Sequence, residues 1–481
     1  MKKASTLVAL TIAAAMALTA CGGGDKSSSD SSTKAEDTAT ATAQATDTAG
    51  DTATTDEQTP ADDNANTGET TEIKLWLAGG DTNDDLRAYL KDTFEAQNPG
   101  YSLKIETIDW GDLVAKLTTS MPDPATTPDV VEVGNTQSPT FTNVGAFLDI
   151  SDMYEELGGA KLLQSFVEVG EVDGKNYTLP YYFGSRYMFY RVDVWAEAGL
   201  EVPTTLDEFN ERVVALTKAN PKGVKDFSGF FIGGQDWRNG ISWIFANGGE
   251  LAKKEGDQWV STLSDPNTIK GLEQLQTLQL EASMAPADAK DQSPWLYIND
   301  SDQVTEDSGD VTETSLAAGT IMAPGWAHWS IGDAVENEDG TVAREWNPEK
   351  FGVFVLPGND GKPAPVFAGG SNIGISAASQ HPEQAKNLMR IIFSAEFQQM
   401  MGGAGLGPAN SDYVSSLGSD EFAQALIDSA LNSKLTPAAP GWATVEAQGV
   451  LEEFFQKVSE GGDIAALAAE YDEIITPLLN G

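Results

Sequence analysis

The sequence predicts an α/β protein in which strands and helices alternate around a mostly parallel sheet. Alternating or apolar segments typical of strands are followed several times by apolar residues at helical spacing. The chain of 481 residues is also long enough to bury two sizeable hydrophobic cores. Because ligands of such sheets bind beyond the carboxyl ends of the strands, we expect a binding site in the loops that follow them.

The first predicted elements lie between residues 73 and 137. Residues 73–77 and 103–108 alternate as strands do, and each of these strands is followed by a helix signal. Residues 128–133 form a third strand, which is largely apolar. The ends of such strands meet along one edge of the sheet. The loops expected at that edge are residues 79–81, 109–110 and 134–137.

The rest of the chain carries turn, capping and periodicity signals. Thr205 and Glu208 form a capping box at the start of a helix that is expected to reach about Ala219. The other expected elements are a hairpin with Asp-Gly at its turn (171–177), an aromatic strand (179–190), a short helix (192–199), a helix (266–282), two strands (351–357 and 367–375) and a helix (382–393).

The N-terminus has the features of a secretion signal. Lys2 and Lys3 precede an apolar run over residues 7–18, which is too short for a permanent membrane span. The run ends at Leu-Thr-Ala-Cys, which resembles the lipobox of bacterial lipoproteins. This resemblance implies removal of residues 1–20 and diacylation of Cys21, whose acyl chains would hold the protein at a membrane. The alternative is an ordinary cleaved signal, although a sole cysteine at this position favours the lipoprotein.

The segment after Cys21 is acidic and rich in Ala, Thr and Ser. Residues 22–72 contain no Val, Ile, Leu, Met, Phe, Trp or Tyr. A segment without these side chains cannot bury enough apolar surface to offset the entropy of ordering. We therefore expect residues 21–72 to be a disordered linker that starts at the lipidated cysteine, and the folded part to begin at residue 73.

Composition argues against several classes of function. The chain has 29 Lys and Arg against 73 Asp and Glu, a formal net charge of −44, which argues against nucleic-acid binding. With one cysteine, neither a disulfide nor a thiolate metal site is expected. His328 and His381 are the only histidines, which leaves little for a Ser-His-Asp or multi-histidine site. We expect no metal and no cofactor.

From about residue 73 to the C-terminus, the order of motifs resembles the extracellular solute-binding proteins of ABC sugar importers, the maltose-binding-protein-like family. Arg191 and Val192 stand where that family usually has Asn-Lys. The motifs that carry the resemblance are Trp76 in the opening strand, Pro-Asp-Val (128–130), Gly-Lys-Asn-Tyr-Thr-Leu-Pro (174–180), Tyr-Arg-Val-Asp (190–193), Ala-Gly-Leu through Glu-Phe (198–209), Pro-Gly-Trp (324–326) and the Gly-Gly return strand (367–375).

The resemblance implies a two-lobed α/β fold of the Venus-flytrap type with three hinge crossings between the lobes. A ligand that contacts both lobes at once drives closure about such a hinge. The crossings are expected near residues 181–186, 369–375 and 426–434. The expected domains are lobe 1 (73–183 and 370–430) and lobe 2 (184–369 and 431–481).

A sugar site requires aromatic platforms, because a pyranose ring has an apolar C–H face. Trp326 is the first expected platform, since its Gly-Trp pair matches a family position that often stacks on sugar, and Trp442 is the next. Trp329 is either a second platform or a packing residue. Further options, for which core packing is the simpler explanation, are Trp237, Trp243 and Trp295.

The hydroxyls of a sugar also require polar partners, which we expect at strand ends and crossings. Arg186 lies at the first crossing, where its fork of donors can reach either lobe; an interlobe salt bridge is the alternative. Gly370 and Ser371 offer backbone groups at the second crossing, or Gly370 simply permits the hinge turn. The other expected polar residues are Asp81, Asp109, Asn135 and Asp236.

The leading hypothesis is a lipid-anchored receptor at the extracellular face of the membrane. It would capture an oligosaccharide or another sugar and deliver it to the permease subunits of an ABC transporter with a cytoplasmic ATPase. We expect a monomer without enzyme activity that contacts the membrane only through its lipid. The alternatives are a receptor of the same fold for a polyamine, iron or a phosphonate, and a secreted glycoside hydrolase that uses two carboxylates.

Overall fold

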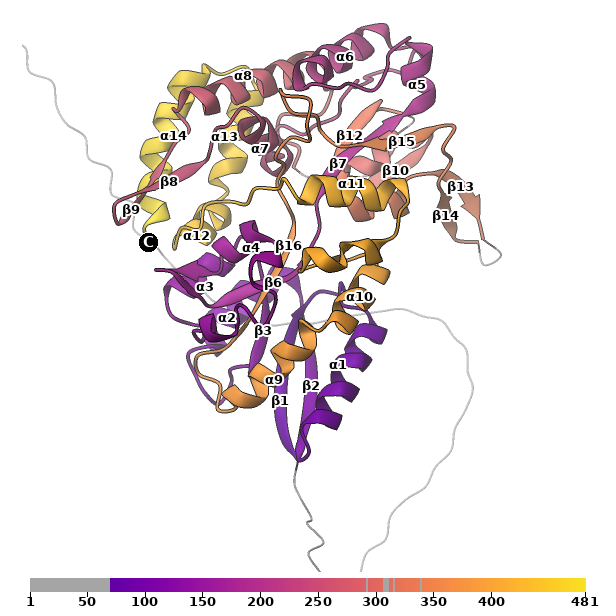
Figure 1. Cartoon of the computed structure of the whole chain (residues 1–481). Coiled ribbons are helices and arrows are strands. Elements are labelled where there is room, and N and C mark those ends of the chain that lie inside the picture. The colour runs from indigo at the N-terminus through magenta and orange to yellow at the C-terminus, as the bar shows by residue number, and fades with distance from the viewer. Residues whose placement is uncertain (1–69, 291–292, 306–310, 315, 338–339) are drawn as a thin grey trace, which may run out of the picture. The chain divides into compact units, whose positions relative to one another are not determined.

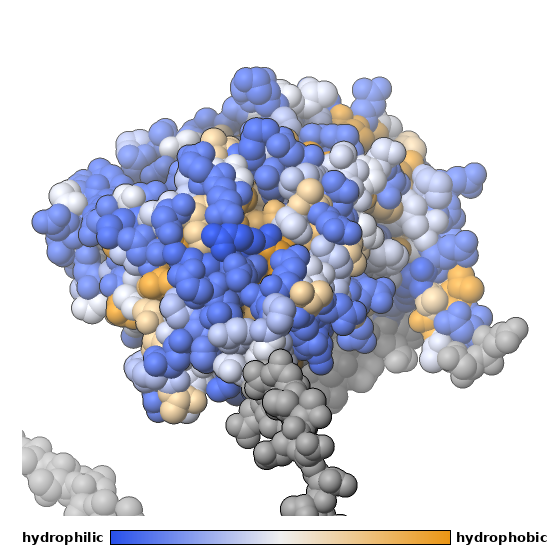
Figure 2. Space-filling view, turned by 60° about the horizontal axis from the view of Figure 1, so that its bottom comes forward, coloured by the Kyte–Doolittle hydropathy of each residue, from blue (hydrophilic) through white to orange (hydrophobic). Residues whose placement is uncertain are grey.

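The computed structural model describes residues 70–481 except 291–292, 306–310, 315 and 338–339 (Figure 1). The predicted signal, Cys21 and the linker up to residue 69 lie outside the described residues. Strand β1 spans Thr71–Ala78, so the first strand starts two residues before the expected position. Within the described residues, no helix is both long enough and apolar enough to cross a bilayer. Figure 2 shows hydrophilic residues over most of one face, in keeping with the strongly acidic composition.

The first lobe is built on a six-stranded sheet with the order β17-β6-β16-β3-β1-β2. Strand β1 pairs in parallel with β2 and β3, as expected, but β16 runs antiparallel to β3 and β6. The expectation of a mostly parallel sheet is therefore wrong beyond the first three strands. The reason is that β16 enters the sheet at the edge where β3 and β6 end. The remaining strands are β2 (Tyr101–Ile108), β3 (Val130–Gly134), β6 (Thr178–Phe183), β16 (Gly370–Ile375) and β17 (Gly407–Pro408).

Alternate residues of β1 point to opposite faces of this sheet, and different helices cover each face. Leu75 and Leu77 belong to one hydrophobic cluster, whereas Trp76 and Ala78 belong to another. The helices of the first cluster are α1 (Asp84–Gln97), α9 (Pro382–Ile392) and α10 (Ala395–Gly403), and those of the second are α2 (Trp110–Ser120) and α3 (Ser138–Asn143).

The second lobe contains a three-stranded antiparallel sheet with the order β12-β7-β15. The strands are β7 (Arg186–Arg191), β12 (Thr320–Pro324) and β15 (Phe351–Phe354). The helices of this lobe are α5 (Val192–Glu197), α6 (Leu206–Ala219), α7 (Trp237–Ala246), α8 (Pro266–Glu281), α12 (Trp442–Ala447), α13 (Val450–Ser459) and α14 (Ile464–Leu479).

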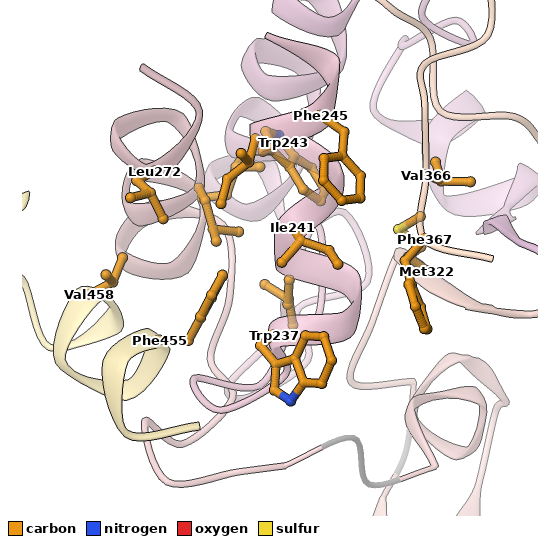
Figure 3. Close-up of a cluster of buried hydrophobic side chains, with 14 of the residues drawn as sticks. Trp237, Ile241, Trp243, Phe245, Leu272, Met322, Val366, Phe367, Phe455 and Val458 are labelled. Atoms are coloured by element: carbon orange, nitrogen blue, oxygen red, sulfur yellow. The ribbon is translucent and has the colours of Figure 1, made fainter. Parts of the chain in front are cut away.

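A large hydrophobic core holds the helices of the second lobe together. Trp237, Ile241 and Trp243 of α7 lie in this core with Leu272 of α8 and Phe455 of α13 (Figure 3). Short elements complete the chain. They are α4 (Gln164–Glu168), the 3₁₀ helices η1 (Ser151–Met153), η2 (Gly159–Lys161), η3 (Pro294–Ile298), η4 (Gly325–Ser330) and η5 (Ser411–Leu417), and the hairpin strands β4 (Glu171–Val172), β5 (Lys175–Asn176), β8 (Ala252–Glu255), β9 (Gln258–Ser261), β10 (Asp302–Thr305), β11 (Val311–Thr314), β13 (Asp333–Glu336) and β14 (Val342–Glu345).

Three segments connect the two sheets. Gly184 and Ser185 separate β6 from β7, so the expected aromatic strand over 179–190 is two strands, one in each sheet. Phe367 and the residues after it lead into β16, and Phe367 pairs with Lys434 in an isolated parallel bridge. The segment that leads into β16 therefore lies beside the chain at Lys434.

The remaining connection lies earlier in the chain than expected. Helix α11 (Glu421–Ala430) was assigned by sequence to lobe 1. Its Ala425 and Leu426 instead share a hydrophobic cluster with Tyr187 of β7 and Ile321 of β12. Helix α11 therefore packs against the sheet of the second lobe, and the chain has crossed before residue 421. The other limits of the two lobes stay predictions.

Candidate functional site

A cleft of about 880 Å³ is lined by residues of both lobes. Strands β1, β3 and β6 end beside it, which is where ligands of parallel strands are expected. The first lobe contributes the segments after these strands and the C-terminal end of α10. The second lobe contributes the end of β12, the short helix η4 and the start of α11. A second cavity, of about 590 Å³, lies between α4, β8 and residues 433–438, and none of the expected site residues lines it.

Tryptophans form one wall of the cleft. Trp326 and Trp329 of η4 are 55% and 75% exposed, and both line the cleft. A 3₁₀ helix places side chains three residues apart on the same side, which brings both indoles to one wall. Trp295 meets Trp326 edge to face with 4.7 Å between the ring centroids. Large exposed aromatic surfaces of this kind mark interaction sites.

His328 fixes this wall to the neighbouring helix. Its ring stacks on Phe422 of α11 with 4.6 Å between centroids and an angle of 19°. Its Nδ1 lies 2.7 Å from the carbonyl oxygen of Gly325. Burial lowers the pKa of His328, which favours a neutral ring at neutral pH. The histidine therefore positions the tryptophans of η4 by packing.

Asp81 is the polar centre of the first lobe's side of the cleft. The residue is exposed and lines the cleft in the loop after β1. Its Oδ2 accepts a hydrogen bond from Trp110 Nε1 and another from Tyr182 Oη, each at 3.0 Å. Both donors also line the cleft.

The structure places the other expected polar residues in different roles. Asn135 lines the cleft, but it is 3% exposed and donates its Nδ2 hydrogen to the Ala368 carbonyl oxygen. Gly370 also lines the cleft. Ser371 is buried and donates to Glu132 Oε1 at 2.6 Å, beneath the site. Asp109 is exposed at the start of α2 and is not among the lining residues.

Arg186 and Asp236 lie at the base of the second lobe's side. Arg186 lines the cleft while only 7% exposed, and its Nη1 donates to Asn239 Oδ1 at 3.1 Å. Asp236 caps α7 by accepting the backbone hydrogen of Asn239, and it also accepts from the Asn239 side chain. Because Asp236 does not line the cleft, its contribution is to the base that holds Arg186.

Trp442, the second expected platform, and Trp243, one of the further options, lie in the core of the second lobe. Trp442 is 1% exposed and packs edge to face with Trp237, with 6.3 Å between centroids. Trp243 is fully buried and donates to Asn210 Oδ1 at 3.0 Å. The alternative of core packing therefore describes both residues in this structure, and it describes Trp237 as well.

Several lining residues were missed from the sequence. Trp110 was passed over in favour of its neighbour Asp109, although both follow the end of β2. Tyr182 lies in the expected aromatic strand but was not among the expected site residues. Arg238 and Asp420 carried no sequence signal, because packing in the second lobe alone brings α7 and the start of α11 to the cleft. No group of three or more His, Cys, Asp or Glu that could hold a metal occurs within the part of the chain that the structure describes.

Comparison with known proteins identifies the family. The family model described as bacterial extracellular solute-binding protein matches residues 79–399. The diacetylchitobiose binding protein DasA of Streptomyces coelicolor is 30% identical over 380 residues, which are 78% of this chain and 81% of that protein.

Solved structures show the same fold at low sequence identity. The sugar-binding protein MalE of Xanthomonas citri has a TM-score of 0.68 and 19% identity, over 85% of this chain and 97% of that one. UgpB of Mycobacterium tuberculosis, solved with glycerophosphocholine, has a TM-score of 0.63 and 18% identity, over 85% and 98% of the two chains. The chain is thus two-lobed and belongs to the family of bacterial extracellular solute-binding proteins.

Proposed function

We propose that this protein is the carbohydrate receptor of an ABC importer. The observation that carries the proposal is a cleft lined by tryptophans from both lobes, with Trp110 on one side and Trp295, Trp326 and Trp329 on the other. Indole rings stack on the apolar face of a pyranose, and the polar residues between them suit its hydroxyls. A ligand held by both lobes at once would favour closure.

The charges that line the cleft favour an uncharged ligand. Among the described lining residues there are two carboxylates, Asp81 and Asp420, and two guanidinium groups, Arg186 and Arg238. A polyamine site needs converging carboxylates without such counter-charges. An iron site would need clustered tyrosinates, yet the hydroxyl of Tyr187 donates to the Gly325 carbonyl oxygen and that of Tyr182 donates to Asp81. These observations therefore support a sugar over a polyamine or iron.

A thermal-shift screen tests this proposal. The panel contains monosaccharides, N,N′-diacetylchitobiose, maltose and longer oligosaccharides, with spermidine and glycerophosphocholine as non-sugar ligands. Diacetylchitobiose comes first because the relative at 30% identity is named for it. A ligand at roughly 100 times its Kd stabilises the folded state by about 2.7 kcal/mol and raises the melting temperature by several degrees. If only a non-sugar ligand raises it, or none does, the proposal is wrong.

We also propose that the protein binds its ligand without cleaving it. The family is of a substrate-binding kind, which supports this proposal. Incubating the purified protein with oligosaccharides and separating the products by chromatography tests it. The expected result is unchanged oligosaccharide, whereas steady cleavage would favour the glycoside hydrolase.

Finally, we propose that the receptor is anchored outside the cell by a lipid on Cys21, works as a monomer and delivers its ligand to the permease subunits. The sole cysteine at the end of the signal-like segment supports the anchor. Replacing it, Cys21→Ser, is expected to move the protein from the membrane fraction to the medium. Retention of the variant in the membrane fraction would contradict the anchor.

A further inference from the structure

Trp110 lies across two glycines at the strand ends of the first lobe. A Cβ added at Gly79 would lie 2.7 Å from Trp110 Nε1, and one added at Gly134 would lie 3.4 Å from Trp110 Cζ3. Gly79 also has a φ of +56°, which residues with a side chain rarely adopt. The two edges of the indole therefore rest against the backbone after β1 and at the end of β3. The ring is 37% exposed and lines the cleft, so part of it is available to a ligand.

The polar edge of the same ring is used within the protein. Trp110 Nε1 and Tyr182 Oη both donate to Oδ2 of Asp81, each at 3.0 Å. Among the described residues, no hydrogen bond is made to Oδ1 of Asp81. Two donors on one oxygen fix the plane of the carboxylate and leave the other oxygen for a ligand.

The loop that carries Asp81 is braced from behind. Arg87 of α1 donates from Nε to the Thr82 carbonyl oxygen at 2.6 Å and from Nη2 to that of Gly79 at 3.2 Å. The Thr82 hydroxyl lies 2.9 Å from the hydroxyl of Tyr181. Tyr181 and Tyr182, whose rings meet edge to face with 5.6 Å between centroids, therefore hold neighbouring residues of one loop. Such bracing lowers the cost of ordering a binding group when its ligand arrives.

We propose that Trp110 is a platform of the first lobe on which a sugar ring stacks. We also propose that Trp110 and Tyr182 position Asp81 to accept a hydrogen bond from that sugar. A sugar ring that stacks on Trp110 would donate a hydroxyl or amide hydrogen to Asp81 Oδ1. Trp110 would thus serve twice, with its face toward the ligand and its N–H toward Asp81. This inference rests on the proposed function, since it names the part of a carbohydrate that the first lobe recognises.

The positioning of Asp81 can be tested without any ligand. The experiment records the indole N–H signals in ¹H–¹⁵N spectra of the full chain carrying Cys21→Ser. The signal that disappears in Trp110→Phe identifies Trp110. In Asp81→Ala this signal is expected to move upfield, because the indole loses a charged acceptor, whereas the other indole signals stay in place. A Trp110 signal that does not respond to Asp81→Ala would overturn the positioning role.

Binding of diacetylchitobiose tests the same role in function. Tyr182→Phe removes only the hydroxyl, and we expect it to weaken binding roughly tenfold in the wild-type background. In the Asp81→Ala background it should have almost no effect, because its target is gone. If Tyr182→Phe weakens binding equally in both backgrounds, the hydroxyl acts on the ligand directly and the positioning role is wrong.

The platform is tested by a third variant. Trp110→Ala is expected to weaken binding by a further tenfold or more in the Asp81→Ala background, because stacking does not depend on the carboxylate. Trp259→Phe, on β9 and outside the cleft lining, is the matched control and should bind as the wild type does. If adding Trp110→Ala to the Asp81→Ala variant does not weaken binding further, Trp110 is not a platform. If the wild type binds no sugar of the panel, the platform fails together with the proposed function, and the indole spectra still decide the positioning of Asp81.

Discussion

At the scale of single residues, exposure separates binding tryptophans from packing ones. Trp326 is 55% exposed, although an indole gains more than almost any other side chain from burial. Its edge-to-face contact with Trp295 holds the ring in place at the cleft. An exposed and held aromatic ring loses little conformational entropy when a ligand binds, which is typical of residues that dominate binding energy.

Replacing this ring, Trp326→Ala, is expected to weaken sugar binding by about 2 kcal/mol while the melting temperature changes little. Isothermal titration calorimetry measures the affinity. Leu431→Ala is a matched control, since Leu431 is 59% exposed and lies outside the cleft lining. An unchanged affinity of the Trp326→Ala variant would remove this residue from the site.

Glu132 of β3 is a fully buried carboxyl group behind the site. It accepts hydrogen bonds from the backbone of Ala78 and from Ser371. Burial outweighs these bonds and raises the pKa of Glu132 from 4.5 to about 8. The folded state therefore holds a proton that the unfolded chain releases at a lower pH. The contribution of Glu132 to the free energy of unfolding is complete below pH 4.5 and is lost as the pH rises toward about 8.

The variant Glu132→Gln tests this pH dependence, because its neutral amide can accept from the Ala78 backbone and donate to the Ser371 hydroxyl at any pH. Urea unfolding of both proteins is measured between pH 5 and 9. We expect the stability of the wild type relative to the variant to fall as the pH rises to about 8 and then to level off. A difference that does not vary with pH would show that Glu132 is ionised throughout.

Sequence reasoning at this scale could predict the kind of residue but not its burial. Asp81 follows an apolar strand, and a strand end is visible in the sequence. Trp326 and Trp442 both follow a glycine, yet one is exposed and the other is 1% exposed. The difference arises from α13 and α14, whose packing around Trp442 no local pattern reveals.

At the scale of elements, capping signals located helix starts well. Thr205 accepts the backbone hydrogen of Glu208 at 3.3 Å, as a capping box requires. The Glu208 carboxylate, however, accepts from the backbone and hydroxyl of Thr204, one residue before the predicted partner. The hydrogen bond accepted by Thr205 is therefore as expected. The bonds accepted by Glu208 differ, and they hold the residue before the helix cap.

Removing the cap, Thr205→Ala, is expected to lower the free energy of unfolding by about 1 kcal/mol, because one backbone hydrogen at the start of α6 loses its acceptor. Thr118→Ala is the control, since Thr118 is exposed inside α2 and bonds only to the Val114 carbonyl oxygen of its own helix. Chemical denaturation measures both. Equal effects of the two substitutions would contradict a capping role.

Element boundaries at crossings were harder to predict. The aromatic run over 179–190 looks continuous because its residues favour strands on both sides of Gly184. Its division follows from pairing, since Tyr182 pairs with Ser371 of one sheet and Met188 with Met322 of the other. The position of α11 has the same origin, because an amphipathic helix can cover either lobe.

At the scale of the whole folded part, α12 of the second lobe meets the first lobe beside the cleft. The Thr136 hydroxyl, after β3, donates to Glu446 Oε2 at 3.1 Å. Arg238 lies on the other carboxylate oxygen, with 3.6 Å between Nη2 and Oε1. The Glu446 side chain is 13% exposed, and this burial raises the pKa of Glu446. Thr136 and Arg238 both line the cleft, so this contact between the lobes lies at the cleft itself.

Removing the donor, Thr136→Ala, is expected to shift the ligand-free protein away from the described arrangement of the lobes. A hydrogen bond of this kind contributes about 1 kcal/mol, or roughly fivefold in population. Small-angle X-ray scattering should then give a larger radius of gyration. Thr136→Ser keeps the hydroxyl and should match the wild type. If both variants scatter as the wild type does, the contact does not hold the lobes.

The overall architecture was predictable because many modest motifs occur in a family order from residue 73 onward. The alternation of strands and helices indicated the first sheet, and the family resemblance indicated two lobes. Composition could not indicate how the lobes share the cleft. That depends on Arg238 of α7 and Phe422 of α11, two helices that were not among the expected elements.

The most direct test of the account is a crystal structure of the protein with the saccharide that gives the largest thermal shift. The account predicts a sugar ring in the cleft, with one face on Trp326 or Trp110 and a hydroxyl or amide group at Asp81. A saccharide bound outside this cleft, or bound within it without contact to any of these three residues, would contradict it.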